Sequence, residues 1–345
     1  MMPPGTDAAD SPSDSTSLVS QPSQRNSLWF VYLAFLFPAL AGFLFGYDIG
    51  TASGAVASLS ALSNATNATQ LTTLEVSIFT SASLFGATLG SILAFWIGQP
   101  LGRRRELILG STLYLLGSLV SGLGPGDAAT VVSGRAVYGF GIAFCMHAAP
   151  VYISEMAPAA QRGLLVSLKE GFIVLGVLCG FAATACAEHF LAAAEVYRTV
   201  WTPAALVGVL IAVGMSQMPP SPRWLMLRDS VALLPKQPTR GRELAAAALR
   251  RFRRGASEAE IEAEIEEIEA TLAEAAGGGG GGGGCREILR ARRALVAGLG
   301  LVVLQQLTGQ PSVLYYQVSG GHSHFDLTWS SGGHSHFDLT WSAAA

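Results

Sequence analysis

Two charged residues stand in stretches of the sequence that are otherwise apolar. Asp48 follows a run of apolar and glycine residues, and Arg135 lies in another apolar stretch further along the chain. A charge within a membrane is costly unless it faces water or a partner, and such charges are functional by default. A carboxyl in this setting can bind and release a proton, because its protonation depends on burial and on nearby cations. Asp48 is therefore the first candidate for proton chemistry.

A second group of residues could hold a ligand through hydrogen bonds. Gln305 and Gln306 are adjacent, and Tyr315 and Tyr316 follow further along the same apolar stretch. A glutamine amide both donates and accepts hydrogen bonds, and a tyrosine adds an aromatic face. This combination suits a neutral ligand that both donates and accepts hydrogen bonds. The alternative is that the glutamines only join neighbouring helices by hydrogen bonds within the membrane.

The composition indicates what kind of protein must position these residues. Only 13% of the 345 residues are charged, and 50% are hydrophobic. Soluble domains carry roughly 25% charged residues. A chain this long and this poor in charge cannot hide its apolar surface in one soluble core, so the sequence predicts an integral membrane protein.

Apolar stretches that are long enough to cross a bilayer recur along the chain. A membrane-spanning helix needs about 20 largely apolar residues. Seven stretches qualify, at residues 28–51, 74–98, 106–124, 130–152, 164–187, 199–217 and 294–316.

The basic residues between these stretches predict the orientation of the chain. Arg103 to Arg105 separate the second and third stretches, and Arg162 and Lys169 separate the fourth and fifth. The segments after the first and third stretches contain no Lys or Arg. Because positively charged loops stay in the cytosol, we expect a cytosolic N-terminus. The glycosylation sequons at Asn64 and Asn67 would then lie on the opposite side.

The remaining segments are polar and less regular. Residues 1–27 are rich in Ser, Pro and Asp, which favours a disordered cytosolic tail. Residues 218–293 form a predicted cytosolic insert with a basic helix at 241–254 and an acidic helix at 257–274. An uninterrupted glycine run follows at 277–284 and indicates a flexible linker.

The end of the chain, residues 317–345, differs from the rest. The twelve residues 319–330 are repeated without change at 331–342, and three alanines follow. Each copy holds a His-x-His-x-Asp pattern whose side chains are able to bind Zn²⁺. A wrong reading frame, a gene-model error or a low-complexity tail explains a perfect repeat better, so we expect no metal site.

Six local patterns carry a resemblance to a known family. In chain order they are GFLFGYDIGTASGA at 42–55, LGRRR at 101–105, the pair Gly134–Arg135 with Gly139 and Gly141, PVYISEMAPAAQR at 150–162, SPRWL at 221–225 and QQLTGQPSVLYY at 305–316. Together they resemble the sugar porter family of the major facilitator superfamily. Within that family, the chain looks most similar to the plant-type vacuolar or plastid proton–sugar symporter-like branch.

The resemblance implies a fold and a domain organisation. We expect an all-α transmembrane protein, with the six-helix N-terminal half at 28–217, the insert at 218–293 and a seventh helix at 294–316. Transporters of this superfamily have two six-helix halves with the substrate between them near the midplane. Helices eight to twelve have no counterpart here, so we expect a C-terminally truncated transporter in which the resemblance ends at about Tyr316.

The resemblance also implies roles for individual residues. Asp48 is expected to carry the coupled proton, with Arg135 as its partner. The alternative is a static ion pair that only holds helices together. Gln305, Gln306 and Glu170 match positions that contact the sugar, and Tyr315 and Tyr316 belong to the same expected site. Glu170 is a departure, because the family commonly has Gln there.

A network of cytosolic charges is a further implication. The family has an inner salt-bridge network that locks the outward-open state, and its expected members here are Arg103, Arg104, Glu155, Arg162 and Arg223. Two carboxylates of the usual pattern are replaced, one by Gln99 and one by Pro220. We expect these departures to weaken the network.

The function implied by the resemblance is transport of a monosaccharide, a hexose or a pentose. Proton symport by alternating access across a lipid bilayer is the expected mechanism. Nothing in the sequence indicates an enzyme, a cofactor or a nucleic-acid partner. The plasma membrane, the vacuolar membrane and the plastid envelope remain alternatives. A non-transporting half-transporter or regulatory partner is an alternative function, and a seven-helix receptor is a weaker one.

Overall fold

The computed structural model describes residues 23–65, 72–158, 161–228, 238–253, 256–277 and 292–309. All regular structure in these ranges is helical. The elements in chain order are α1 (Ser23–Ala65), α2 (Thr73–Leu101), α3 (Arg103–Leu123), α4 (Ala128–Met156), α5 (Arg162–Phe190), the short 3-10 helix η1 (Ala193–Glu195), α6 (Val196–Trp201), α7 (Pro203–Gln217), α8 (Pro222–Arg228), α9 (Pro238–Phe252), α10 (Glu258–Gly277) and α12 (Arg292–Leu307).

Six segments are long and apolar enough to cross a membrane. They are Phe35–Asn64, Leu74–Leu101, Arg103–Leu123, Ala128–Met156, Arg162–Phe190 and Ala193–Gln217. These segments confirm the first six predicted spans. The first helix is longer than predicted: α1 begins at Ser23, inside the expected tail, and continues to Ala65 instead of ending near residue 51.

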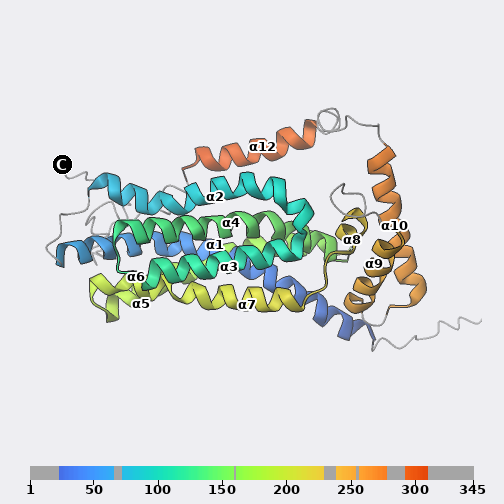
Figure 1. Ribbon diagram of the computed structural model, residues 1–345, viewed down its shortest axis with the longest axis horizontal. Coiled ribbons are helices and arrows are strands. Elements are labelled where there is room, and N and C mark those ends of the chain that lie inside the picture. The colour runs from blue at the N-terminus through green and yellow to red at the C-terminus, as the bar shows by residue number, and fades with distance from the viewer. Residues whose placement is uncertain are drawn as a thin grey trace, which may run out of the picture.

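The membrane helices pack in pairs within one elongated bundle (Figure 1). α1 packs along α5, α2 along α4, and α3 against both α4 and α7. Glycines at every fourth position of α1 make the first of these contacts close. A Cβ atom on Gly46 would lie only 1.9 Å from the carbonyl oxygen of Ile173 on α5. Small residues at this spacing let two helix backbones approach within a membrane.

The turn between α2 and α3 also depends on a glycine. Gly102 has φ +83°, a conformation that favours glycine. Its α-carbon faces Trp224 of α8, because a Cβ there would lie 2.5 Å from the indole ring. Trp224 Nε1 donates a hydrogen bond to the Gln99 carbonyl at 2.8 Å. The turn and α8 are therefore held together at this end of the bundle.

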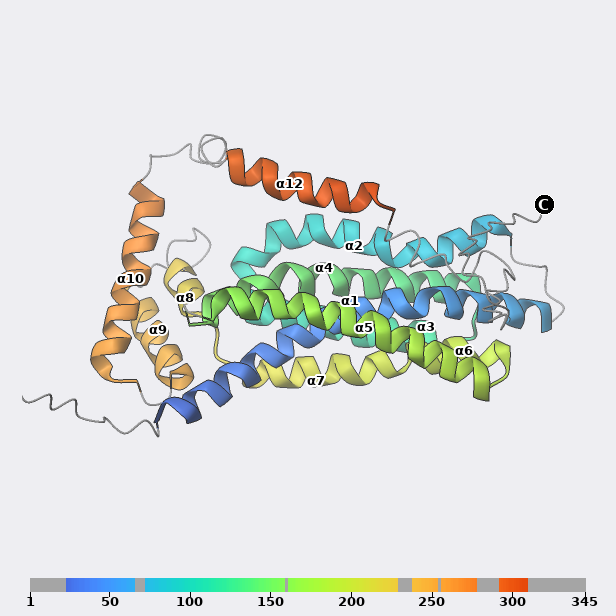
Figure 2. The same ribbon diagram turned by 180° about the vertical axis from the view of Figure 1, so that it is seen from behind.

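The insert between the sixth span and α12 contains the two predicted charged helices. The basic helix is α9 and the acidic helix is α10. Ile261 and Ile265 of α10 are buried against Leu249 of α9. The insert gathers at one end of the bundle, where α8, α9 and α10 lie together in both views (Figure 2).

α12 differs from the six spans. In both views it runs along the outside of the bundle beyond α2. Its apolar part, Val296–Leu307, is shorter than the other spans. Residues 310–316 of the predicted seventh span, like the repeated tail, lie outside the described residues.

Candidate functional site

Asp48 and Arg135 meet in the interior of the bundle. Asp48 comes from α1 and Arg135 from α4, and both residues are at most 2% exposed. The guanidinium grips the carboxylate with both terminal nitrogens: Nη2 donates to Oδ2 at 3.0 Å, and Nη1 donates to Oδ1. A two-pronged contact of this kind is the strong form of a charged hydrogen bond. The two charges thus satisfy each other far from water.

Further groups surround this pair. Arg135 Nη2 also donates to Ser83 Oγ on α2 at 2.9 Å, and that hydroxyl lies 3.4 Å from Asp48 Oδ2. The guanidinium carbon lies 4.9 Å from the ring centre of Trp201 and 5.7 Å from that of Tyr138. Aromatic faces attract cations at such distances. Arg135 therefore keeps favourable contacts even if Asp48 becomes neutral.

Close helix contacts bring these groups together. Gly139 of α4 approaches α2 so closely that a Cβ there would lie 2.1 Å from the Ser83 carbonyl oxygen. A small cavity next to the pair is lined by Tyr47, Asp48, Thr51, Ser118, Ser121, Arg135, Tyr138, Trp201 and Ala204. Ser83 was not predicted from the sequence. Its only signal is a hydroxyl in an apolar span, which is too common to be specific.

The predicted sugar-binding residues are not gathered in the same way. Gln305 and Gln306 are exposed on α12, while Asp48 and Arg135 lie inside the bundle. Tyr315 and Tyr316 fall outside the described residues. A Cβ atom on Gly298 or Gly300 of α12 would meet nothing within 4 Å. The structure therefore leaves the proposed sugar contacts of α12 without partners from the described bundle.

Glu170 lies on an open face of α5. Its side chain is 65% exposed and its Oε1 lies 2.7 Å from Nζ of Lys169, which is itself buried. Val174 and Leu178 on the same helix are also exposed. The orientation prediction counted Lys169 as a residue of a cytosolic loop, and the structure corrects this. Lys169 lies within α5, and its stem packs over Gly42 of α1.

The predicted cytosolic network is assembled only in part. Arg103 Nε lies 3.8 Å from Glu155 Oε1, and the charge of Arg223 also acts on Glu155. Arg104 instead donates to backbone carbonyl oxygens at the end of α7, with 3.0 Å from Nε to the oxygen of Met215. Arg162 is exposed at the start of α5 and forms no ion pair with the described residues.

Several polar atoms of this network lack a hydrogen-bond partner within the part of the chain that the structure describes. Nε and Nη1 of Arg103 and Oε2 of Glu155 are buried without a hydrogen-bond partner among the residues described. Each of these atoms would gain from one more group of opposite character, since an unmet buried polar group is costly.

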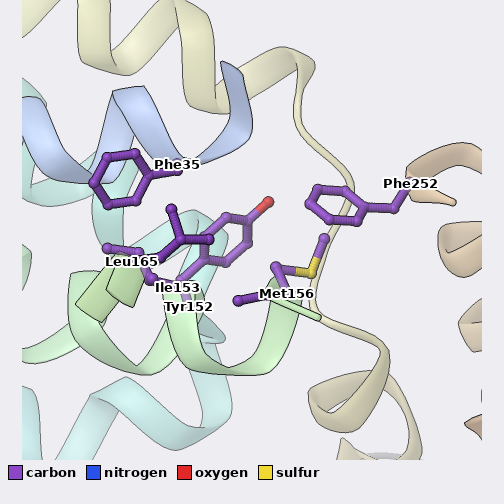
Figure 3. A pocket seen from close by; sticks show the side chains of 7 residues that line it. Phe35, Tyr152, Ile153, Met156, Leu165 and Phe252 are labelled. Carbon is purple, nitrogen blue, oxygen red and sulfur yellow. The ribbon is translucent and has the colours of Figure 1, made fainter. Parts of the chain in front are cut away.

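A cluster of apolar side chains holds the insert against the membrane helices (Figure 3). Phe252 of α9 lies beside Met156 and Tyr152 at the end of α4, and the same pocket is lined by Phe35 of α1 and Leu165 of α5. Phe252 is 2% exposed. Tyr152 also donates to the Pro219 carbonyl at 2.9 Å. No pattern in the sequence indicates this contact.

The sequence matches a known protein family over most of its length. Residues 34–319 match the family described as sugar (and other) transporters. The chain belongs to this family. Its members are transporters rather than enzymes, and a receptor is not favoured. The six spans make the chain an integral membrane protein of the major facilitator fold.

Individual relatives support the same assignment. The chain is 41% identical over 317 residues to the chloroplastic D-xylose-proton symporter-like 3 of Arabidopsis thaliana, covering 90% of this chain and 56% of the relative. It is 29% identical to the galactose-proton symporter of Escherichia coli strain K12, over 85% of this chain and 57% of the relative. It also resembles the partially occluded, inward-open structure of the xylose transporter XylE from E. coli. That match has a TM-score of 0.66 and 25% identity, over 83% of this chain and 66% of the other. The chain therefore spans only about half the length of the curated relatives.

Proposed function

We propose that this chain forms the proton-coupling part of a monosaccharide transporter, with Asp48 as the proton carrier and Arg135 as its partner. The buried, two-pronged contact between these side chains carries the proposal. The names of two relatives, a D-xylose-proton symporter-like protein and a galactose-proton symporter, support it. The substrate class is a neutral hexose or pentose.

The local chemistry suggests how a proton acts at this pair. Protonation of Asp48 removes one of two charges that attract each other strongly in a dry interior. Arg135 then keeps its hydrogen bond to Ser83 and its contacts with two aromatic rings. α1 and α4 lose their strongest polar link at that moment. A proton can therefore bias the balance between inward-open and outward-open states, because it binds them with different affinity.

The sugar contacts belong to a different surface in this proposal. Glu170 faces outward from α5, and Gln305 and Gln306 face outward from α12. Tyr315 and Tyr316 complete the proposed set. A sugar site would form where α12 and the parts of the transporter that the longer relatives possess meet the open face of α5. Arg103, Glu155 and Arg223 are the proposed core of the cytosolic lock on this movement.

The proposed orientation has the N-terminus and the insert in the cytosol. Asn64 is exposed at the end of α1 that points away from the insert (Figure 1). Glycosylation of Asn64 in a microsomal translation assay would support this orientation. A reporter that works only outside the cytosol can be fused to the N-terminus, and activity of that reporter would contradict the proposed orientation. The chloroplast named for one relative makes the plastid envelope one candidate membrane.

Uptake of labelled D-xylose into vesicles tests the function. The assay needs both halves, so residues 1–309 are joined to the remaining part of the 41% identical Arabidopsis relative, and vesicles with this chain alone are compared. We expect Asp48→Asn to abolish accumulation driven by a proton gradient and to retain exchange of sugar at equilibrium. Glu258→Gln, which removes one negative charge from the exposed insert, is the matched control. Proton-driven accumulation by Asp48→Asn would show that Asp48 is only a structural partner of Arg135.

A further inference from the structure

A second buried carboxylate lies outside the Asp48–Arg135 site. Glu106 is in the first turn of α3 and is completely buried. His147 of α4 reaches it, with 2.6 Å between Nδ1 and Oε1, and 39% of the His147 side chain is exposed. The pair therefore joins a fully enclosed acid to an imidazole that has access to the outside.

The surroundings offer little else to the carboxylate. α2 presents Gly98, where a Cβ atom would lie 3.0 Å from both Glu106 oxygens and 2.9 Å from His147 Cε1. Any larger residue would fill the space that the pair occupies. Oε2 of Glu106 is buried without a hydrogen-bond partner among the residues that the structure describes. The neighbouring Cys145 thiol of α4 is also buried.

The charges around Glu106 do not balance without a proton. Arg103, one turn earlier on α3, is the guanidinium that acts on Glu106, and it also faces Glu155 of α4. One largely buried guanidinium thus faces two carboxylates, of which Glu106 is fully buried and Glu155 is partly buried. Arg223 acts on Glu155 as well, but it is exposed on α8. A net negative charge in a low-dielectric interior is unfavourable, and one bound proton cancels it.

We propose that Glu106 and His147 form a second proton-binding site, in which the pair shares one proton. The proton lies between Nδ1 and Oε1, so the pair is neutral overall whether the imidazole or the carboxyl carries it. The exposed edge of His147 gives the proton a way in and out. Such a site is distinct from the coupling pair, because Arg135 and His147 are twelve residues apart on α4, or about 18 Å along its axis. The proposal does not depend on which solute the transporter carries.

Spectroscopy on the purified chain in lipid nanodiscs tests this site directly. A free imidazole is almost wholly neutral at about pH 8, because its pKa is about 6.5. In the wild-type chain at that pH we expect either a charged His147 ring in the ¹⁵N spectrum or an infrared band of a protonated carboxyl. Whichever of these two signals the wild-type chain gives should be lost in Glu106→Gln, because a neutral amide needs no proton. The proposal would be overturned if the His147 ring is neutral and if no protonated-carboxyl band of the wild-type chain disappears in Glu106→Gln.

The assignment can be made without disturbing the pair. The chain has six histidines, and the other five are His189, His322, His324, His334 and His336. Changing these five to Gln leaves His147 as the only source of imidazole signal, in a chain whose α3–α4 contact is untouched. His189→Gln alone is the matched control and should leave the His147 signal unchanged. Even if Glu106→Gln fails to fold, a charged His147 ring at about pH 8 in this five-fold variant supports the proposal, and a neutral ring with no protonated-carboxyl band at all overturns it.

Discussion

The Asp48–Arg135 pair and the Gln305–Gln306 pair have opposite settings in the same chain. The charged pair is enclosed by α1, α2, α4 and α6, and its polar groups meet each other. The two glutamines lie on exposed turns of α12, which runs outside the bundle (Figure 2). The described helices supply the hydrogen-bonding and aromatic partners of the charged pair. The two glutamines can donate and accept hydrogen bonds, but the described helices offer them no partner surface.

The difference follows from the energetics of the two kinds of side chain. A charge in an apolar interior must be paired, since losing its partner leaves an uncompensated charge. An amide carries no net charge, so leaving it exposed costs less than leaving a buried charge without its partner. Charged residues in apolar spans therefore force a local structure, whereas glutamines acquire their role only when another surface meets them. Substitutions at enclosed and exposed positions should reveal this contrast.

Removing one partner of the buried pair should have the largest effect. Asp48→Ala leaves the Arg135 charge enclosed and uncompensated, so we expect a loss of about 3–5 kcal/mol of stability. The measurement is thermal unfolding of the purified chain in detergent. The double variant Asp48→Asn with Arg135→Met removes both charges and should recover a large part of the loss.

The exposed pair supplies the comparison for that experiment. Gln305→Ala and Gln306→Ala change side chains that lie outside the bundle, and we expect changes within about 0.5 kcal/mol. If either glutamine variant destabilises the chain as much as Asp48→Ala, then α12 packs against the bundle and the contrast between the two regions fails.

Loss of the aromatic anchor should release the insert from the bundle. Phe252 is enclosed by side chains of three membrane helices. Phe252→Ala should weaken this docking by about 3 kcal/mol, as for other buried aromatic side chains. Hydrogen exchange should then become faster in α9 and α10 and stay unchanged in α3 and α4. Leu244→Ala, at an exposed position on α9, is the control. If α9 and α10 are equally protected from hydrogen exchange in the Phe252→Ala chain and the wild type, the ion pairs of the insert are sufficient to keep it in place without Phe252.

A methyl group in the α1–α5 contact should have a smaller effect. A Cβ atom on Gly46 would overlap the Ile173 carbonyl oxygen, so Gly46→Ala has to push the helices apart. We expect a loss of about 1–3 kcal/mol, the usual result of overpacking. Gly298→Ala on α12 adds the same methyl group in open space and should cause no loss. Thermal unfolding of both variants measures the difference, and equal stability would mean that the α1–α5 contact is loose.

The residues that could be predicted from the sequence share a physical reason. Asp48 and Arg135 were found because charges are rare in apolar spans, and the six spans follow from length and hydropathy. Ser83 and Phe252 were missed, because a serine in a helix or a phenylalanine after a basic helix has many ordinary uses. Lys169 was misplaced for a related reason: a basic residue near a span end was counted as a loop residue, although pairing with Glu170 lets it enter α5. Contacts between distant helices depend on packing that no local pattern contains.

The exposed ion pairs of the insert should give the smallest effect, and it should depend on pH. Arg250 hydrogen-bonds Glu258 and lowers the pKa of that carboxyl from its ordinary 4.5. A lowered folded-state pKa contributes stability above the unfolded value, and this contribution is lost as the pH falls through the folded value. We therefore expect Glu258→Gln to lower the unfolding temperature slightly at neutral pH and to match the wild type once the pH has fallen below the folded-state pKa of Glu258. Glu267→Gln, at an exposed α10 position, should show no such pH dependence. A Glu258→Gln deficit that persists in acid would mean that packing of this side chain, rather than its charge, stabilises the insert.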